Sequence, residues 1–323
     1  MDRYAVIVPV YNGQSVIRKC LNSILNQKYI NDLFEISIYV IDDGSTDKTK
    51  EIILEMIKEH NSIKYVYQPN AGVSAARNQG IKLIENEKFC VFVDADDWLD
   101  ERFFENAINQ KADFIYFDWY ELIQKGQKEV MRYNSINRIG SSSWSVENLK
   151  LHFSRYRNGG APWAKVFKVD IIRKYGLAFD ERLPYAEDYI FIIEYLFCCS
   201  TVQHICVPVY YYNCIEEGAA IKYRENFLDI LIVIEEKKRR LFTDEKYFCL
   251  INSQTIEELS YAIRNTMNAK MPKDVKKKVR KQIIEYMHNK ELGAYSIIQS
   301  NACVRSKLEI MIFILFNSGR KVK

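Results

Sequence analysis

The sequence predicts an α/β fold in which helices flank a mostly parallel sheet, with a helical extension at the C-terminal end. Three observations support this prediction. Short apolar runs alternate with segments of helical periodicity over the first 118 residues. Several of these apolar runs end directly in polar clusters. From residue 223 onward the apolar spacing is helical and cations become more frequent.

The elements of the first part alternate in order. Apolar runs rich in β-branched and aromatic residues predict five strands, at 4–10, 36–41, 63–67, 89–93 and 114–117. Helical spacing, as in Cys20, Leu21 and Ile24, predicts helices between them, and Thr46 or Asp47 can cap the second helix. Apolar strands that alternate with amphipathic helices are typical of a parallel sheet covered on both faces.

Three polar clusters directly follow predicted strands. They are Tyr11-Asn12, Asp42-Asp43 and Asp94 to Asp97. Ligands of open α/β sheets bind outside the carboxyl ends of the strands. We therefore expect these clusters to converge on one crevice and to form a binding site there.

The middle of the chain has a mixed pattern. The run Val207–Tyr212 contains Pro208, which has no amide hydrogen to donate, so this run is predicted to be an edge strand. The segment Glu187–Cys199 has helical spacing and an acidic start. The changes of pattern divide the chain into three regions, 1–118, 119–215 and 216–323.

Composition and charge exclude several classes of protein. With 323 residues, 48% of them apolar and 27% charged, the chain is neither disordered nor of low complexity. A net charge of +4 is too balanced for nucleic acid to be the main partner. The sequence has no apolar stretch near the ~20 residues of a membrane span, no signal-peptide pattern, and eight cysteines without a CxxC pair. We predict a cytoplasmic protein with free thiols.

The strongest chemical signal is Asp94-Ala95-Asp96 at the end of a predicted strand. Two carboxylates at this spacing can ligate one divalent cation, which keeps coordination positions open for a diphosphate. The alternative is a helix N-terminus with an acidic first turn. Taken alone, the pattern favours neither interpretation.

Other segments are weaker signals. The pair Asp42-Asp43 can accept hydrogen bonds from a nucleobase or ribose, or can form a turn before a capped helix. In segment 70–80, Arg77 among small residues can meet a diphosphate or can be a surface arginine in a plain loop. The four histidines show no zinc-like spacing, and His204 in its apolar run is expected to be structural. The first loop lacks the GxGxxG pattern of dinucleotide-binding folds.

In this order and spacing, VIVPVYN, VIDDGSTDKT, NAGVSAARNQGI and VDADD resemble the family 2 glycosyltransferases. The resemblance is specific over about 4–100 and continues thinly to about 213, where GAPWAKVF resembles the family's acceptor-side strand and Glu187-Asp188 its catalytic acidic pair. It implies a Rossmann-like GT-A fold and inverting transfer from a nucleotide sugar. It further implies that 1–118 bind the nucleotide sugar and 119–215 the acceptor.

The resemblance also assigns roles to single residues. Asp188 matches the general base that removes the proton of the acceptor hydroxyl, and Glu187 would orient it. The alternative for this pair is the acidic first turn of a helix. Asp96, with Asp94, matches the ligands of Mn²⁺ or Mg²⁺. Residues expected to contact the donor are Pro9, Tyr11, Asp42, Asp43, Arg77, Asp94 and Ala95.

Two segments leave questions open. Residues 213–220 are acidic where the family often has a basic loop that closes over the donor, so that Lys222 or Arg224 would have to replace its cation. The apolar run 308–316 is flanked by cations. Packing on the body or on a second subunit of a homo-oligomer is one interpretation of this run. Peripheral contact with the inner face of the plasma membrane is the other.

The sequence therefore predicts an inverting, metal-assisted glycosyltransferase that moves a sugar from a UDP-sugar donor to a hydroxyl of a glycan acceptor. Family analogy with bacterial surface-polysaccharide enzymes implies an acceptor linked to lipid. Two alternatives stay open, a nucleotidyltransferase acting on a nucleoside triphosphate and a catalytically silent glycan-binding or scaffold protein. The donor sugar and the linkage position are not determined.

Overall fold

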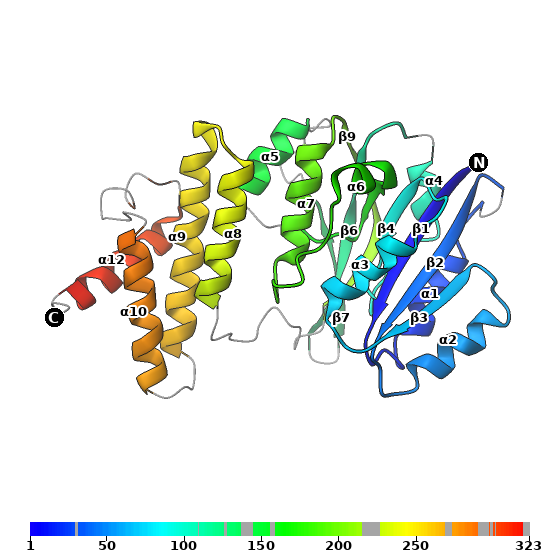
Figure 1. Ribbon diagram of the computed structural model, residues 1–323, viewed down its shortest axis with the longest axis horizontal. Coiled ribbons are helices and arrows are strands. Elements are labelled where there is room, and N and C mark those ends of the chain that lie inside the picture. The colour runs from blue at the N-terminus through cyan, green and yellow to red at the C-terminus, as the bar shows by residue number, and fades with distance from the viewer. Residues whose placement is uncertain are drawn as a thin grey trace. The chain divides into compact units, whose positions relative to one another are not determined.

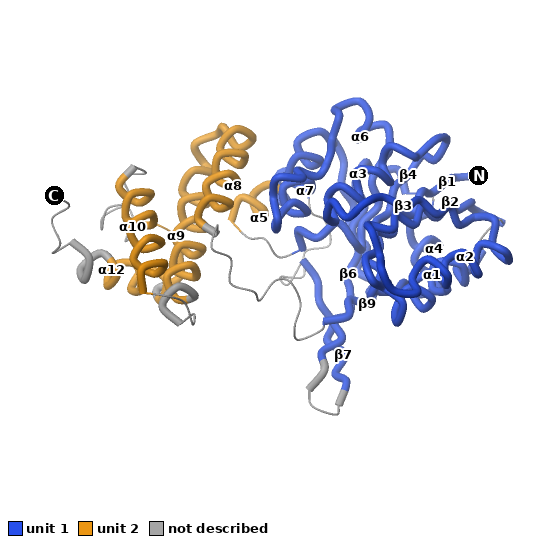
Figure 2. The backbone as a smooth tube through the Cα atoms, turned by 60° about the horizontal axis from the view of Figure 1, so that its bottom comes forward, with its two compact units in different colours: residues 1–149, 158–218 blue, residues 150–157, 219–323 orange. Residues whose placement is uncertain are grey.

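The computed structural model forms two compact units, residues 1–149 with 158–218 and residues 150–157 with 219–323 (Figures 1 and 2). Within them, the structure describes residues 1–29, 32–108, 110–125, 128–136, 145–155, 159–214, 227–268, 273–289, 297, 300 and 302–318.

One mixed sheet forms the first unit. In the described residues its strands are β1 (Asp2–Val10), β2 (Phe34–Asp43), β3 (Ile63–Gln68), β4 (Phe89–Phe92), β5 (Trp98–Leu99), β6 (Phe114–Lys125), β7 (Lys128–Asn134), β8 (Lys165–Lys168) and β9 (Val202–Cys214). Their order is β3-β2-β1-β4-β8-β6-β9-β5, and β7 pairs with β6. Strands β3, β2, β1 and β4 are parallel to their neighbours in this group, and β6 is parallel to β9. The predicted α/β fold with a mostly parallel sheet is confirmed.

Helices connect these strands. They are α1 (Ile17–Leu25), α2 (Thr49–Ile57), α3 (Val73–Leu83), α4 (Phe103–Ala107), α5 (Val146–Arg155), α6 (Val169–Tyr175) and α7 (Glu187–Cys198). Helix α3 approaches β1 closely, because a Cβ atom added to Gly80 would lie 2.5 Å from Ile7 Cγ2. Residues 4–8 of β1 are all fully buried, as expected for a strand covered on both faces.

The pairing of β6 and β9 corrects one prediction. Strand β9 is not the edge strand, since β5 pairs with it on the side away from β6. Phe117 is opposite Ile205 but Asp118 is opposite Pro208, so Cys206 and Val207 have no partners in β6. Proline is tolerated at such a bulge because the ladder of hydrogen bonds is already interrupted there.

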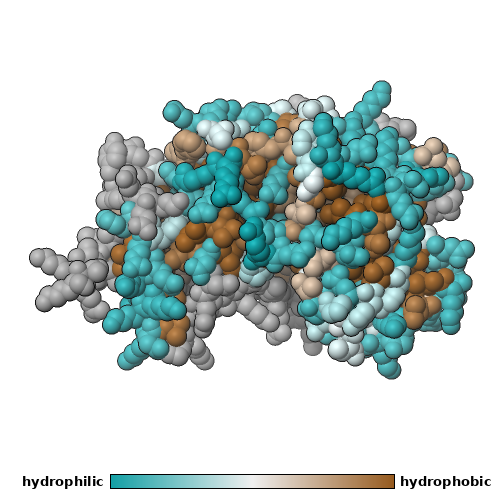
Figure 3. Space-filling model, viewed as in Figure 1, coloured by the Kyte–Doolittle hydropathy of each residue, from teal (hydrophilic) through white to brown (hydrophobic). Residues whose placement is uncertain are grey.

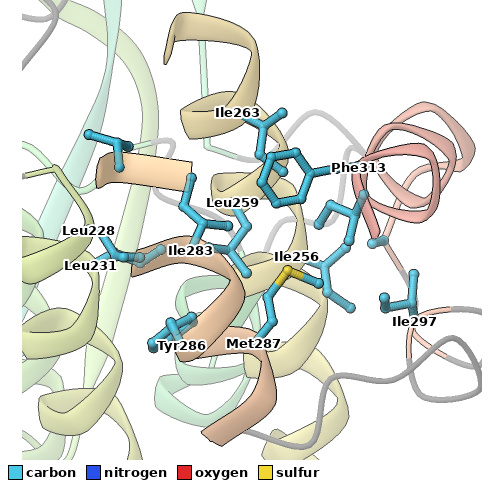
Figure 4. Close-up of a cluster of buried hydrophobic side chains, with 13 residues drawn as sticks. Leu228, Leu231, Ile256, Leu259, Ile263, Ile283, Tyr286, Met287, Ile297 and Phe313 are labelled. Carbon is cyan, nitrogen blue, oxygen red and sulfur yellow. The ribbon is translucent and has the colours of Figure 1, made fainter. Parts of the chain in front are cut away.

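The second unit is helical, so the predicted C-terminal extension is confirmed. Its helices in the described residues are α8 (Phe227–Leu241), α9 (Glu245–Asn268), α10 (Lys273–Asn289) and α12 (Val304–Ser318). Their apolar faces meet in one buried cluster (Figure 4), and among its members are Leu231, Ile256, Leu259, Ile283 and Phe313. Across the described helices, none combines the length and the apolar character that crossing a membrane requires.

Polar contacts also hold the helices of the second unit together. Glu309 of α12 accepts hydrogen bonds from Arg264 and Ser260 of α9. Glu235 of α8 is buried and accepts from the Tyr286 hydroxyl of α10. On the face drawn in Figure 3, hydrophilic residues follow the outer margins of both units, and hydrophobic residues are visible further in.

Candidate active site

The loops after β1 and β2 contact each other at the carboxyl edge of the sheet. The register places Val10 opposite Asp42, so the two strands end at the same level. The backbone amide of Asn12 donates to the Ser45 hydroxyl at 2.9 Å, and its side-chain oxygen accepts from the Thr46 amide at 2.8 Å. Two of the three predicted polar clusters therefore lie together, as the ends of parallel strands should.

Both carboxylates of the Asp42-Asp43 pair are buried and bonded within the chain. Asp42 accepts from the Ser45 amide and from the Tyr65 hydroxyl. Asp43 accepts from the Gln68 side chain and from the amides of residues 71 and 72. A carboxylate has about four acceptor positions, so about one position of Asp43 stays available for a ligand. These bonds shape the loop, and uridine contact remains a prediction.

Two other predicted donor contacts differ in exposure. Tyr11 is 54% exposed at the end of β1, whereas Pro9 is buried within the strand. The exposed ring of Tyr11 therefore has a surface that a planar ligand can cover. Pro9 can act only through the backbone that it positions.

The acidic loop after β4 is anchored to β9 by Asp97, which was predicted only as a member of the polar cluster Asp94 to Asp97. Its carboxylate accepts from the Tyr210 hydroxyl at 2.6 Å and from the Asn213 amide at 2.8 Å. The Tyr210 oxygen accepts in turn from the Asp94 amide at 3.2 Å. The one sequence signal for Asp97 was its position directly after Asp96.

The same loop concentrates negative charge. Burial, and then the charge of Asp94, raise the pKa of Asp96 above its ordinary value. Burial and the charges of Asp94 and Asp96 likewise raise the pKa of Asp97. In the described part of the chain, no basic side chain pairs with Asp96. A hard divalent cation, which prefers carboxylate oxygens, would relieve this repulsion, so the residues present fit such an ion.

Arg77 joins the acidic loop to α7. Its Nη2 lies 2.9 Å from Asp94 Oδ1, and its Nη1 lies 3.2 Å from Glu187 Oε1. The Arg77 side chain is only 6% exposed, and both of these contacts are with carboxylates of its own chain. Contact between Arg77 and a diphosphate remains a prediction. The structure does bring the β4 loop and the Glu187-Asp188 pair to one place.

The start of α7 is held in an uncommon backbone conformation. Ala186, which precedes Glu187, has φ of 61°. Ala164, before β8, also has a positive φ of 54°. Left-handed backbone at non-glycine residues costs about 1–3 kcal/mol and concentrates at functional sites. Asn78 of α3 fixes the loop that leads into α7, with two side-chain hydrogen bonds to the backbone of Phe179.

Burial and the neighbouring charge of Asp188 raise the pKa of Glu187, although Arg77 acts in the opposite direction. Asp188 itself is half-buried. Glu187 and Asp188 occupy the acidic first turn of α7, which agrees with the alternative interpretation of this pair as a helix start. Glu187 also accepts a hydrogen bond from Arg77, which connects the pair to the acidic loop.

Lys165 lies near Asp188. No individual role was predicted for this residue from the sequence. It is 1% exposed, and its Nζ donates to the Trp163 carbonyl at 3.2 Å. Burial lowers the Lys165 pKa to about 7, while the charge of Asp188 acts against this change. The Trp163 ring is stacked between Tyr210, at 4.9 Å, and Tyr212, at 5.1 Å. The segment of the predicted donor lid beyond Cys214, through Arg224, lies outside the described residues.

The mixed sheet, the acidic loop beyond β4 and the acidic pair at the start of α7 form the arrangement expected of a nucleotide-dependent group transferase. Comparison with known proteins identifies the family. The family model "Glycosyl transferase family 2" matches residues 5–158. The chain is 33% identical over 192 residues to Glycosyltransferase GlyA of Streptococcus pneumoniae, a match that covers 55% of this chain and 26% of GlyA. Residues 5–158 form a family 2 glycosyltransferase domain, and the chain is a glycosyltransferase enzyme.

Solved structures show the same fold. Staphylococcus aureus TarS in complex with UDP-GlcNAc has a TM-score of 0.72 and 17% identity, covering 100% of this chain and 93% of that chain. A mannosyltransferase from Pyrobaculum calidifontis, in complex with GDP-Man and Mn2+, has a TM-score of 0.53 and 15% identity, covering 99% of this chain and 88% of that chain. At these identities the likeness concerns the fold alone, and the predicted GT-A fold is confirmed.

Proposed function

We propose that this glycosyltransferase moves a sugar, with inversion, from a UDP-sugar to a hydroxyl group of a glycan acceptor. The observation that carries the proposal is the bridge formed by Arg77, which contacts Asp94 and Glu187. Asp94, on the donor side, and Glu187, on the acceptor side, therefore contact the same guanidinium group. The donor and the acceptor can thus be held close enough to react in one step. The UDP and UDP-GlcNAc complexes of TarS support the choice of donor.

Asp188 acts as the general base in this proposal. Direct attack by the acceptor oxygen on the anomeric carbon, opposite the departing diphosphate, inverts that carbon. The Asp188 carboxylate accepts the hydroxyl proton as the new bond forms. Glu187, held by Arg77 at 3.2 Å, fixes the first turn of α7 and thereby the direction of Asp188.

Asp96 and Asp94 would hold a divalent cation, Mn²⁺ or Mg²⁺. When bound, the cation neutralises charge on the departing diphosphate. The carboxylate of Asp96, which pairs with no basic side chain among the described residues, supports this assignment. The mannosyltransferase of this fold was solved with Mn2+. Asp97 keeps the loop in place through its bonds to β9.

The regions of the chain would divide the work. Residues 1–118 would bind the nucleotide sugar through Tyr11, the Asp42-Asp43 loop, Arg77 and the backbone of Pro9 and Ala95. Residues 119–215 would bind the acceptor. A lipid-linked glycan is the acceptor class that we favour. For the run 308–316 we favour packing over membrane contact, because Ile310 and Phe313 are buried in the cluster of the second unit.

A paired variant experiment tests the assigned base. Asp188→Asn should keep UDP binding in calorimetry and lose transfer by about 10²–10⁴-fold, because the hydroxyl proton has no acceptor. Asp170→Asn is the matched control, since Asp170 is an exposed acid in the first turn of α6. Full activity of Asp188→Asn would remove Asp188 from the role of base.

A donor and metal panel tests the rest of the proposal. Turnover with UDP-sugars should stop in EDTA and return with Mn²⁺ or Mg²⁺, and Asp96→Ala should abolish this metal-dependent activity. Turnover of UTP without turnover of UDP-sugars would indicate a nucleotidyltransferase. UDP or glycan binding without any turnover would indicate the silent binding protein.

A further inference from the structure

Three side chains from two strands form a cluster outside the acidic loops. They are Asp118 of β6 and His204 and Cys206 of β9, and their potential ligand atoms all lie within 4.8 Å of one another. The side chains of Asp118 and His204 are each 1% exposed, whereas Cys206 is exposed. The cluster is therefore a buried polar pair with a thiol at the surface.

The hydrogen bonds fix which nitrogen of His204 carries the proton. Asp118 accepts a hydrogen bond from the Tyr133 hydroxyl, and a carboxylate offers only oxygen acceptors. His204 Nε2, at 2.7 Å from Asp118 Oδ1, must therefore donate. Its Nδ1 is left with a lone pair, which faces Cys206 Sγ at 3.5 Å.

The surrounding strands hold this arrangement in place. Tyr116 is directly opposite His204 across the β6–β9 pairing. Its ring is parallel to the imidazole within 3°, at 4.6 Å between centroids. Cys206 lies in the bulge of β9, where residues without partners in β6 are turned out of the ladder. The imidazole plane is fixed, and the thiol is open to solvent.

We propose that His204 Nδ1 and Cys206 Sγ are two protein ligands of a site for a borderline-soft divalent cation such as Zn²⁺. Zinc binds imidazole nitrogen at about 2.0–2.1 Å and thiolate sulfur at about 2.3 Å, so tetrahedral ligands of these types are about 3.5 Å apart. The observed separation of 3.5 Å equals this value. Solvent would complete the coordination.

Asp118 supports the site through its hydrogen bond to His204 Nε2. A carboxylate that accepts from the second ring nitrogen of a ligating histidine fixes the tautomer and makes the ligand more basic. The ligands are nitrogen and sulfur, which disfavour Mg²⁺. This site is therefore chemically different from the carboxylate site of Asp94 and Asp96, and it does not depend on the proposed function.

The thiol must lose its proton to the solvent when the metal–sulfur bond forms. The affinity for the cation should therefore increase as the pH rises.

Titration of the full chain with Co²⁺ tests the proposal, because thiolate ligation gives a sulfur-to-cobalt charge-transfer absorption. The wild type should show this absorption at one equivalent, and Zn²⁺ should displace it. Cys206→Ser should abolish it. Asp96→Ala should keep it, and so should Cys303→Ser, the matched control at another exposed thiol. Absence of the absorption in the wild type, or an unchanged titration of Cys206→Ser, would overturn the site.

A second measurement needs no variant. Zn²⁺ should protect Cys206 from alkylation by iodoacetamide, as read by mass spectrometry, and should leave exposed Cys249 and Cys303 reactive. Equal labelling of all three thiols with and without Zn²⁺ would show that Cys206 only hydrogen-bonds to His204. Asp118→Asn should weaken Co²⁺ binding by about 10–100-fold, and unchanged binding would contradict the supporting role of Asp118.

Discussion

Replacement of Arg77 by methionine should destabilise the first unit strongly. The change removes the guanidinium that contacts both Asp94 and Glu187, at 2.9 and 3.2 Å. The Asp94 and Glu187 side chains are 26% and 11% exposed, so water cannot replace the lost partner fully. Removal of one partner of a buried ion pair costs about 3–5 kcal/mol. Total stabilities are about 5–15 kcal/mol, so the loss should be large but measurable.

The loss should depend on pH in a defined direction. The pKa of Glu187 is already raised above its ordinary 4.5, and removal of Arg77 raises it further. A carboxyl with a raised folded-state pKa contributes stability below its unfolded pKa, and this contribution is lost as the pH rises through the folded-state value. The difference between Arg77→Met and the wild type should therefore be larger at pH 8 than near pH 4.5.

Tryptophan fluorescence during urea unfolding measures this difference. Trp98, Trp119 and Trp163 lie in the described part of the first unit, and the sequence has no tryptophan after residue 163, so the signal reports mainly on that unit. Arg18→Met is the matched control, because Arg18 pairs with Glu55 on the surface. Such an exposed pair contributes no more than about 1 kcal/mol. A loss for Arg77→Met as small as that of the control, or one equal at both pH values, would refute the reasoning.

Two further predictions concern the same unit and use the same fluorescence assay. Lys165→Met should raise the free energy of unfolding at pH 7, because burial lowers the Lys165 pKa from 10.5 to about 7 and the penalty of the buried ammonium is complete only below that pH. Between pH 7 and 9 this advantage should shrink by about 2 kcal/mol, and a gain that does not change with pH would contradict a titrating Lys165. Gly80→Ala should cost about 1–3 kcal/mol, since the added Cβ would lie 2.5 Å from Ile7 Cγ2. An unchanged unfolding midpoint would show that α3 and β1 adjust freely.

The sequence by itself determined the alternating half of the fold. Apolar runs separated by helical spacing carry the parallel strands β1 to β4, because each such strand is buried on both faces and must be apolar throughout. The polar residues that follow β1, β2 and β4 could be placed at one edge from topology alone. Of strands β5, β7 and β8, only β8 was anticipated, through the resemblance of residues 160–167 to the family's acceptor-side strand. Two of them span only two and four residues, and β7 is a hairpin partner with exposed side chains.

Only the tertiary structure decided what the charged residues do. Arg77 and Glu187 are 110 positions apart in the sequence, and Asp97 and Tyr210 are 113 apart, so the sequence pattern does not reveal either contact. The edge-strand prediction from Pro208 was wrong because the bulge arises from the pairing of β9 with β6. It cannot be recognised from the sequence of β9 alone. Burial is the largest cause of the pKa shifts of Lys165 and of Asp96, and this burial arises only when the chain has folded.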